Sequence, residues 1–106
     1  MTARIKPLLK GLKKGLLRLY GKRLKGVVLY GSYARGDYED GSDLDVLVVL
    51  SDFERAPLEI NRTSQLVGGL SLEYLITISP VFMREKDWLL ADKPLLRNIR
   101  AEGVAV

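Results

Sequence analysis

Apolar residues recur along the chain with two different periods, and these periods predict where helices and strands form. Between residues 4 and 24 the apolar positions repeat at helical spacing with lysines between them; they are Ile5, Leu8, Leu9, Leu12, Leu16 and Leu19. A short apolar run rich in β-branched residues at 27–30 predicts a buried strand. A second strand is predicted from Asp43 through the apolar run 46–50.

The second half of the chain predicts one more strand, with helices on both sides of it. Residues 70–78 alternate between apolar and polar side chains and predict a third strand, which Ser79 and Pro80 would stop. A helix that begins at Pro57 is expected to end at Gly68 and Gly69. Two short helices are expected at 84–90 and 94–102. These elements predict an α/β (α+β) fold, a small mixed sheet with helices packed on it.

Length and composition limit the architecture and the chemistry. The 106 residues are expected to form a single domain, 1–106, since domains commonly contain about 100 to 200 residues. The sequence contains no cysteine and no histidine. Disulfides, thiolate or imidazole metal sites and Ser-His-Asp or Cys-His catalysis are therefore excluded. Any bound metal must be held by oxygen atoms.

The positive charge is concentrated at the start of the chain. Residues 1–25 hold nine of the 17 Lys and Arg residues and no acid, so eight bases and all 13 acids lie in the remainder. The lysines of the first helix form either a solvated face or a surface for nucleic acid or an acidic partner. Tyr20 is the one aromatic residue between them, which gives little support for base stacking.

No segment of the sequence indicates a membrane. The chain begins with a lysine-rich amphipathic segment, and no run of about 18 apolar residues exists. The expected location is the cytoplasm.

Gly31 and Ser32 stand where the first predicted strand ends. A residue without a side chain allows a ligand such as a phosphate to approach the backbone closely. Ser32 is placed to cap a short helical turn over 33–35, which would direct its hydroxyl and the first free N–H groups to one point. This turn is a candidate phosphate-binding site.

Asp43 and Asp45 lie two residues apart at the start of the second predicted strand, so their side chains share one face. Two carboxylates this close repel each other unless a cation lies between them. Hard oxygen ligands beside a phosphate site are the arrangement that binds Mg²⁺ together with a nucleotide.

The pattern Gly31-Ser32, ten residues, then Asp43-Leu44-Asp45 before an apolar strand resembles the signature of the DNA polymerase β-like nucleotidyltransferases. Within that superfamily the run GSYARGDYEDGSDLDVLVVL resembles the minimal nucleotidyltransferase (MNT) domains, which are often encoded beside a HEPN-domain partner. The resemblance implies a palm-like core and Mg²⁺-dependent transfer of a nucleotidyl group, most naturally AMP from ATP, to a macromolecular acceptor. It implies that Asp43 and Asp45 hold the metal and that Gly31 and Ser32 bind phosphates.

Two further residues have open roles at this stage. Nucleotidyltransferase sites use a third acid on the neighbouring strand, and Glu73 is the only acid in the predicted strand 70–78. Glu73 is therefore either this third catalytic acid or an exposed strand charge. Arg35 either pairs with Asp37 or Asp40, or contacts the triphosphate.

Three functions remain open from the sequence. The first is a nucleotidyltransferase that modifies a macromolecule, with a HEPN protein as the natural partner and the chain as its antitoxin. The second is a nucleotide-binding protein that neutralises such a partner by contact alone. The third is a nucleic-acid-binding module that uses the basic first helix. Because the predicted fold offers no second domain for a large substrate, surfaces of the partner or of a second copy of the chain are expected to complete the site.

Overall fold

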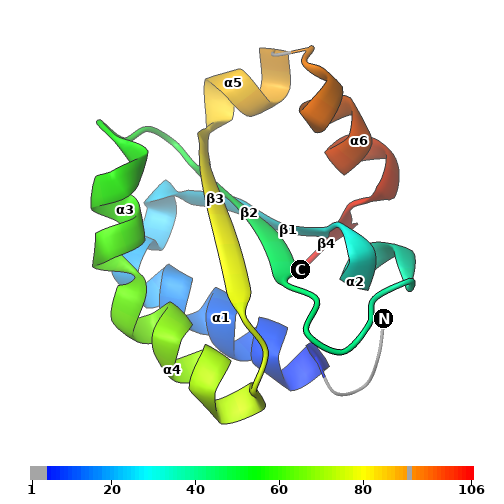
Figure 1. The fold of residues 1–106 in the computed structure, drawn as a ribbon. Coiled ribbons are helices and arrows are strands. Elements are labelled where there is room, and N and C mark those ends of the chain that lie inside the picture. Colours follow the sequence, from blue (N-terminus) through cyan, green and yellow to red (C-terminus); the bar gives the residue numbers. More distant parts are fainter. Residues whose placement is uncertain (1–4, 91) are drawn as a thin grey trace.

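A four-stranded mixed sheet forms the centre of the computed structural model, which describes residues 5–90 and 92–106 (Figure 1). Its strands are β1 (Leu24–Tyr30), β2 (Leu44–Leu50), β3 (Ile78–Arg84) and β4 (Val104–Ala105). Their order across the sheet is β3-β2-β1-β4. β1 is antiparallel to both β2 and β4, whereas β2 and β3 are parallel. The mixed sheet predicted from the sequence is confirmed.

Helices lie on both faces of this sheet. They are α1 (Ile5–Tyr20), α2 (Ser32–Arg35), α3 (Ala56–Arg62), α4 (Ser64–Tyr74), α5 (Glu85–Leu90) and α6 (Pro94–Glu102). The first helix is shorter than expected, because the chain passes through a 3₁₀ turn at Gly21–Arg23 before β1 begins. No helix of the described residues is long and apolar enough to cross a membrane.

The alternation of side chains along β2 divides the core into two parts. One face packs against α1 and contributes Leu44, Val46, Val48 and Leu50. The other face packs against α6 and contributes Leu47 and Val49, which contact a cluster that includes Leu96 and Ile99. Asp45 has the same parity as Leu47 and Val49, so it projects from the α6 face. The candidate site therefore lies on the face that α5 and α6 cover.

The prediction of a strand at 70–78 is wrong. That segment begins inside α4, which runs through Gly68 and Gly69 and ends at Tyr74 (Figure 1). The following residue, Leu75, adopts a left-handed conformation with φ 56°, and β3 starts only at Ile78. Pro80 lies inside β3, at the edge of the sheet, where the missing N–H of proline is tolerated.

A break at Thr63 separates α3 from α4. The Thr63 hydroxyl is buried and donates a hydrogen bond to the Glu59 carbonyl (2.9 Å), which gives the chain its bend between the two helices. Glu59 is also buried, and its carboxylate accepts a hydrogen bond from the Tyr20 hydroxyl at the end of α1 (2.7 Å). The buried polar groups at this junction are thus paired.

Candidate active site

Gly31 forms the turn between β1 and α2. Its φ of 77° and ψ of −157° lie in a region that only glycine adopts without large strain. Its carbonyl accepts hydrogen bonds from the N–H groups of Ala34 and Arg35, both at 3.0 Å. Gly31 occupies the cap position of α2 and makes no side-chain cap bond, so the prediction that Ser32 is the cap is wrong. Ser32 is the first residue of the helix.

This arrangement leaves hydrogen-bond donors unused at the start of α2. Among the described residues, the hydroxyl of Ser32 and the N–H groups of Ser32 and Tyr33 have no protein partner. The Gly31 N–H, in contrast, donates to the carboxylate of Glu102 (3.3 Å). The donors open to a ligand therefore belong to Ser32 and Tyr33 rather than to Gly31.

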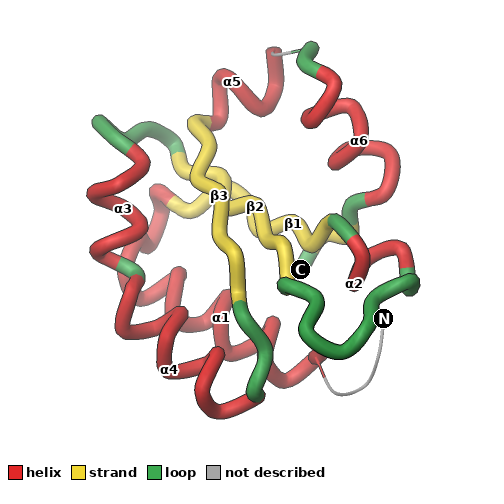
Figure 2. The backbone as a smooth tube through the Cα atoms, viewed as in Figure 1, coloured by secondary structure: helices red, strands yellow, loops and turns green. Residues whose placement is uncertain are grey.

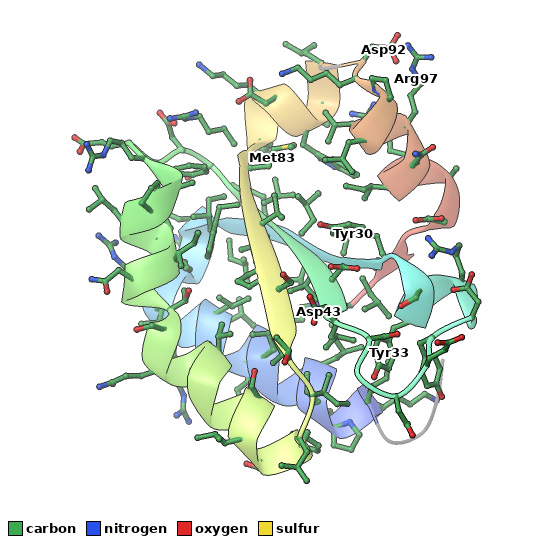
Figure 3. All side chains as sticks on the ribbon, viewed as in Figure 1. Tyr30, Tyr33, Asp43, Met83, Asp92 and Arg97 are labelled. Atoms are coloured by element: carbon green, nitrogen blue, oxygen red, sulfur yellow. The ribbon has the colours of Figure 1, made fainter. Side chains whose placement is uncertain are left out.

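The Asp45 carboxylate lies directly against Gly31. A Cβ atom added to Gly31 would collide with Asp45 Oδ2, so the glycine is required for this close approach. The pKa of Asp45 is raised by partial burial and by the charge of Asp43, and the Arg35 guanidinium opposes this rise. Asp43 immediately precedes β2 and is exposed (Figure 3). The two aspartates are thus close enough for their charges to repel, as their spacing in the sequence predicts.

Neighbouring strands supply Tyr30 and Ser79 on either side of Asp45. Tyr30 is the β1 partner of Asp45, and the pKa of its hydroxyl is raised by burial and by the Asp45 charge. Ser79 is the β3 partner of Asp45. Because paired residues on adjacent strands project from one face, all three side chains lie on the α6 side of the sheet.

Arg35 bridges two acids at the exposed end of α2. Its guanidinium contacts Asp37 and Glu102, each at 3.2 Å. The ion pair between Arg35 and Asp37 is one of the two pairs that the sequence suggested, the other being with Asp40. Glu102 was not predicted, because it lies 67 residues further along the chain at the end of α6 and carries no local signal.

Figure 2 shows the loop between α2 and β2 as a green tube. Contacts within this loop and with α2 hold it in place. The rings of Tyr33 and Tyr38 stack with their centroids 4.3 Å apart. The Glu39 N–H donates to the Ser42 hydroxyl (2.9 Å), and the Ser42 N–H donates to the Glu39 carbonyl (3.0 Å). These contacts fix the stretch of chain that leads into Asp43.

Glu73 does not lie on a strand next to the aspartates. It is an exposed residue of α4, where its carboxylate raises the pKa of Tyr74 after the larger effect of desolvation. The two strands that do pair with β2, namely β1 and β3, contain no Asp or Glu. The strand position on which the third-acid prediction for Glu73 depended is therefore wrong.

The donor set at Asp43 and Asp45 can be tested against the metal that the sequence suggests. The described residues contain no group of three or more acids that could enclose a metal ion. Mg²⁺ needs no such cage, because proteins commonly hold it by one or two carboxylates together with substrate phosphates. Two mutually repelling carboxylates beside the free donors of Ser32 and Tyr33 fit a metal that arrives with a nucleotide.

Comparison with known proteins shows the family to which this chain belongs. A profile of the nucleotidyltransferase domain matches residues 9–97. The chain belongs to the nucleotidyltransferase domain family. This nucleotidyltransferase is 35% identical over 78 residues to "Putative protein adenylyltransferase MJ0141" of Methanocaldococcus jannaschii, a match that covers 74% of the chain and 78% of the relative. A second relative from that organism, "Putative protein adenylyltransferase MJ0604", is 32% identical and is matched over 79% of each chain.

Solved structures share the fold of this nucleotidyltransferase at lower sequence identity. A toxin–antitoxin crystal structure with AMP-PNP superposes with a TM-score of 0.62 at 21% identity, over 91% of this chain and 70% of the other. The crystal structure of a "putative nucleotidyltransferase from Sulfolobus solfataricus" superposes with a TM-score of 0.60 at 20% identity, over 99% of this chain and 86% of the other. The nucleotidyltransferase core expected from the sequence is confirmed.

Proposed function

We propose that this nucleotidyltransferase transfers AMP from ATP to a hydroxyl group of a protein acceptor. The observation that carries the proposal is the contact between the Asp45 carboxylate and the Gly31 backbone, with Asp43 and the free donors of Ser32 beside it. Relatives above 30% identity that are named protein adenylyltransferases support AMP as the transferred group and protein as the acceptor.

Each residue of the site has a role in this proposal. The Ser32 hydroxyl and the N–H groups of Ser32 and Tyr33 bind the terminal phosphates, as free donors at a helix start do. Arg35 neutralises part of the triphosphate charge. Asp43 and Asp45 hold Mg²⁺, which when bound polarises the phosphate oxygens and offsets their charge. The protein thereby positions the α-phosphorus for in-line attack by the acceptor hydroxyl, and pyrophosphate leaves.

The proposed acceptor is a HEPN-domain protein, for which this chain would serve as the antitoxin. The resemblance of residues 31–50 to MNT domains supports this partner. One solved structure with a chain of the same fold is the complex of a tri-AMPylated HEPN toxin of Shewanella oneidensis with MNT antitoxin. That chain superposes with a TM-score of 0.54 at 19% identity. That description applies to the neighbour, and a HEPN partner for this chain is a proposal.

The experiment is a transfer assay with the purified chain, a candidate HEPN protein from the same genome, Mg²⁺ and labelled ATP. Label at the α-phosphate should appear on the HEPN protein, whereas label at the γ-phosphate should not, because pyrophosphate is released. Asp43→Asn and Asp45→Asn should abolish the transfer while the chain remains folded. Equal labelling by the two variants and the wild type would contradict the assignment of the site.

A second candidate function is nucleotide binding without transfer, in which the chain neutralises its partner by contact. The absence of an acid from β3 favours it, since nucleotidyltransferase sites use a third acid on the strand beside the first two. Ser79 occupies the β3 position that pairs with Asp45. If the missing carboxylate is what prevents transfer, Ser79→Asp should gain Mg²⁺-dependent transfer that the wild type lacks. Robust transfer by the wild type would eliminate this candidate.

A further inference from the structure

Glu102 joins the end of α6 to the turn at Gly31. Its carboxylate accepts a hydrogen bond from the Gly31 N–H (3.3 Å) and contacts the Arg35 guanidinium (3.2 Å). The side chain is only 26% exposed, so most of it lies within the fold. Among the described residues, this hydrogen bond is the only one that joins α6 to the Gly31 N–H.

The position of Glu102 is fixed from two sides. Before it, Leu96 and Ile99 of α6 are buried against β2. After it, β4 pairs with β1, with Val104 opposite Leu29. A carboxylate held between a packed helix and a paired strand loses little freedom when it makes its own hydrogen bonds, and this is how a supporting residue fixes a site.

Gly31 needs such support because glycine has many accessible backbone conformations. Its backbone keeps φ 77° and ψ −157° only where the surrounding contacts select this conformation. The carbonyl of Gly31 is held by the N–H groups of Ala34 and Arg35, and its N–H is held by Glu102. If the N–H were released, rotation about the N–Cα bond of Gly31 could move the Ser32 N–H and hydroxyl away from their present position.

We infer that Glu102 is a positioning residue, which holds the Gly31–Ser32 turn in the conformation that presents its free donors to the nucleotide triphosphate. This inference rests on the proposed function, because it assigns those donors to phosphate. Glu102 touches neither the phosphates nor the metal in this role. It acts through the Gly31 N–H, and so it couples α6 to the phosphate site.

The negative charge of Glu102 complicates a simple deletion. Removing the carboxylate frees Arg35 and removes a repulsion for phosphate, which strengthens nucleotide binding, while loss of the hydrogen bond weakens it. Glu102→Gln and Glu102→Met separate these effects, because both lack the charge and have similar length. Only glutamine keeps an oxygen that accepts the Gly31 N–H.

The test compares the binding of ATP with Mg²⁺ and the binding of AMP by calorimetry. We expect Glu102→Gln to bind ATP about three- to tenfold more tightly than Glu102→Met, the range for one hydrogen bond. AMP lacks the β- and γ-phosphates, so the two variants should bind it within about twofold of each other. Arg97→Gln is the matched control, since Arg97 also makes an exposed ion pair from α6, with Asp92, and should bind ATP as the wild type does.

A second measurement works without nucleotide. Amide hydrogen exchange should show that the Gly31 N–H of the wild type is protected, and that of Glu102→Gln protected to a similar degree. Rapid exchange at Gly31 in the wild type would overturn the inference, as would equal ATP affinity of Glu102→Gln and Glu102→Met. If wild type binds no ATP while Gly31 is protected, the proposed function fails and the structural role of Glu102 stands.

Discussion

Asp45 is an acid whose surroundings disfavour its charge. Partial burial and the nearby charge of Asp43 both raise the pKa of Asp45, and Arg35 compensates only in part. The folded chain therefore binds a proton at Asp45 more tightly than the unfolded chain does. Its contribution to stability is complete below the ordinary pKa of 3.8 and is lost as the pH rises through the raised pKa of the folded state.

Replacement of Asp45 by Asn should consequently stabilise the protein without metal while it removes nucleotide binding. Since Asp45 is only partly buried and water screens its charge, we expect a rise in Tm of about 2–5 °C at pH 7 in EDTA. The difference from wild type should shrink as the pH falls toward 4. Asp40→Asn, an exposed change in the same loop, should leave Tm within about 1 °C. A lower Tm for Asp45→Asn at pH 7 would contradict the role of charge.

Gly31→Ala tests the contact between the turn and the carboxylate. The new Cβ would meet Asp45 Oδ2 in a backbone region closed to other residues, so we expect a loss of about 2–4 kcal/mol in the free energy of unfolding. Gly36→Ala is the control, because Gly36 also has a positive φ but faces open space, and about 1 kcal/mol should be lost there. Urea titrations of the three proteins measure both values. Equal losses would mean that the close approach to Asp45 is unimportant.

The residues of the site were predictable where the motif is local. Gly31, Asp43 and Asp45 lie within one short stretch, and the alternation of a strand is enough to place both carboxylates on one face. Glu102 was not predictable, because its contact with Gly31 spans 71 residues and depends on the return of α6 to the sheet. The cap role expected for Ser32 failed because Gly31 takes that position.

At the scale of elements, α4 ends in an unusual way. Leu75 closes the helix in the left-handed conformation, with φ 56°, although it carries a side chain. The Ile76 N–H donates to the Ser71 carbonyl (3.2 Å), a bond typical of a helix end at which glycine is favoured. Because Leu75 is 82% exposed, its side chain contributes little packing in return for the strain.

Leu75→Gly should therefore stabilise the protein by about 0.5–1 kcal/mol, since glycine adopts this conformation without strain. The matched control is Leu72→Gly. Leu72 is 78% exposed but lies inside α4, where glycine should cost about 1 kcal/mol. Chemical denaturation of both variants gives the two values, and destabilisation by Leu75→Gly would show that the side chain has a role that its exposure hides.

This helix end also explains where the prediction of elements failed. Gly68 and Gly69 suggested a stop, and the alternation from Leu70 onward suggested a strand. Packing of Leu66 and Leu70 on the α1 side of the core keeps the segment helical despite both glycines. The elements that follow their own periodicity were predicted, namely α1, β1, β2, α5 and α6. β3 was missed because its place depends on pairing with β2.

At the scale of the whole molecule, the two faces of the sheet differ in the size of their apolar clusters and in their relation to the candidate site. The α1 face contains the larger apolar cluster. The α6 face contains a smaller cluster and, in line with it, Asp45 and the contact of Glu102 with Gly31. Damage to either cluster should lower stability, but damage at Leu96 of α6 should reach the site more directly than damage at Leu16 of α1.

Leu96→Ala and Leu16→Ala test this division. Both side chains are buried, at 2% and 1% exposure, so each variant should lose about 2–4 kcal/mol of stability. At a temperature where both remain folded, we expect Leu96→Ala to bind ATP with Mg²⁺ at least about threefold more weakly than wild type. Leu16→Ala should bind within about twofold of wild type. Equal effects on ATP affinity would show that the two faces are not separate in this respect.

Pro80 should limit the aggregation of the protein through the edge of its sheet. It lies in β3, the strand at one edge of the sheet, and contributes no N–H there. An exposed strand edge is a template on which chains of the same kind can polymerise, and proline is one of the residues that natural proteins use to blunt it. A growing fibril would have to leave one carbonyl acceptor without a donor in every chain at this position. Replacement of Pro80 by valine would restore that donor and would be expected to shorten the lag before amyloid formation.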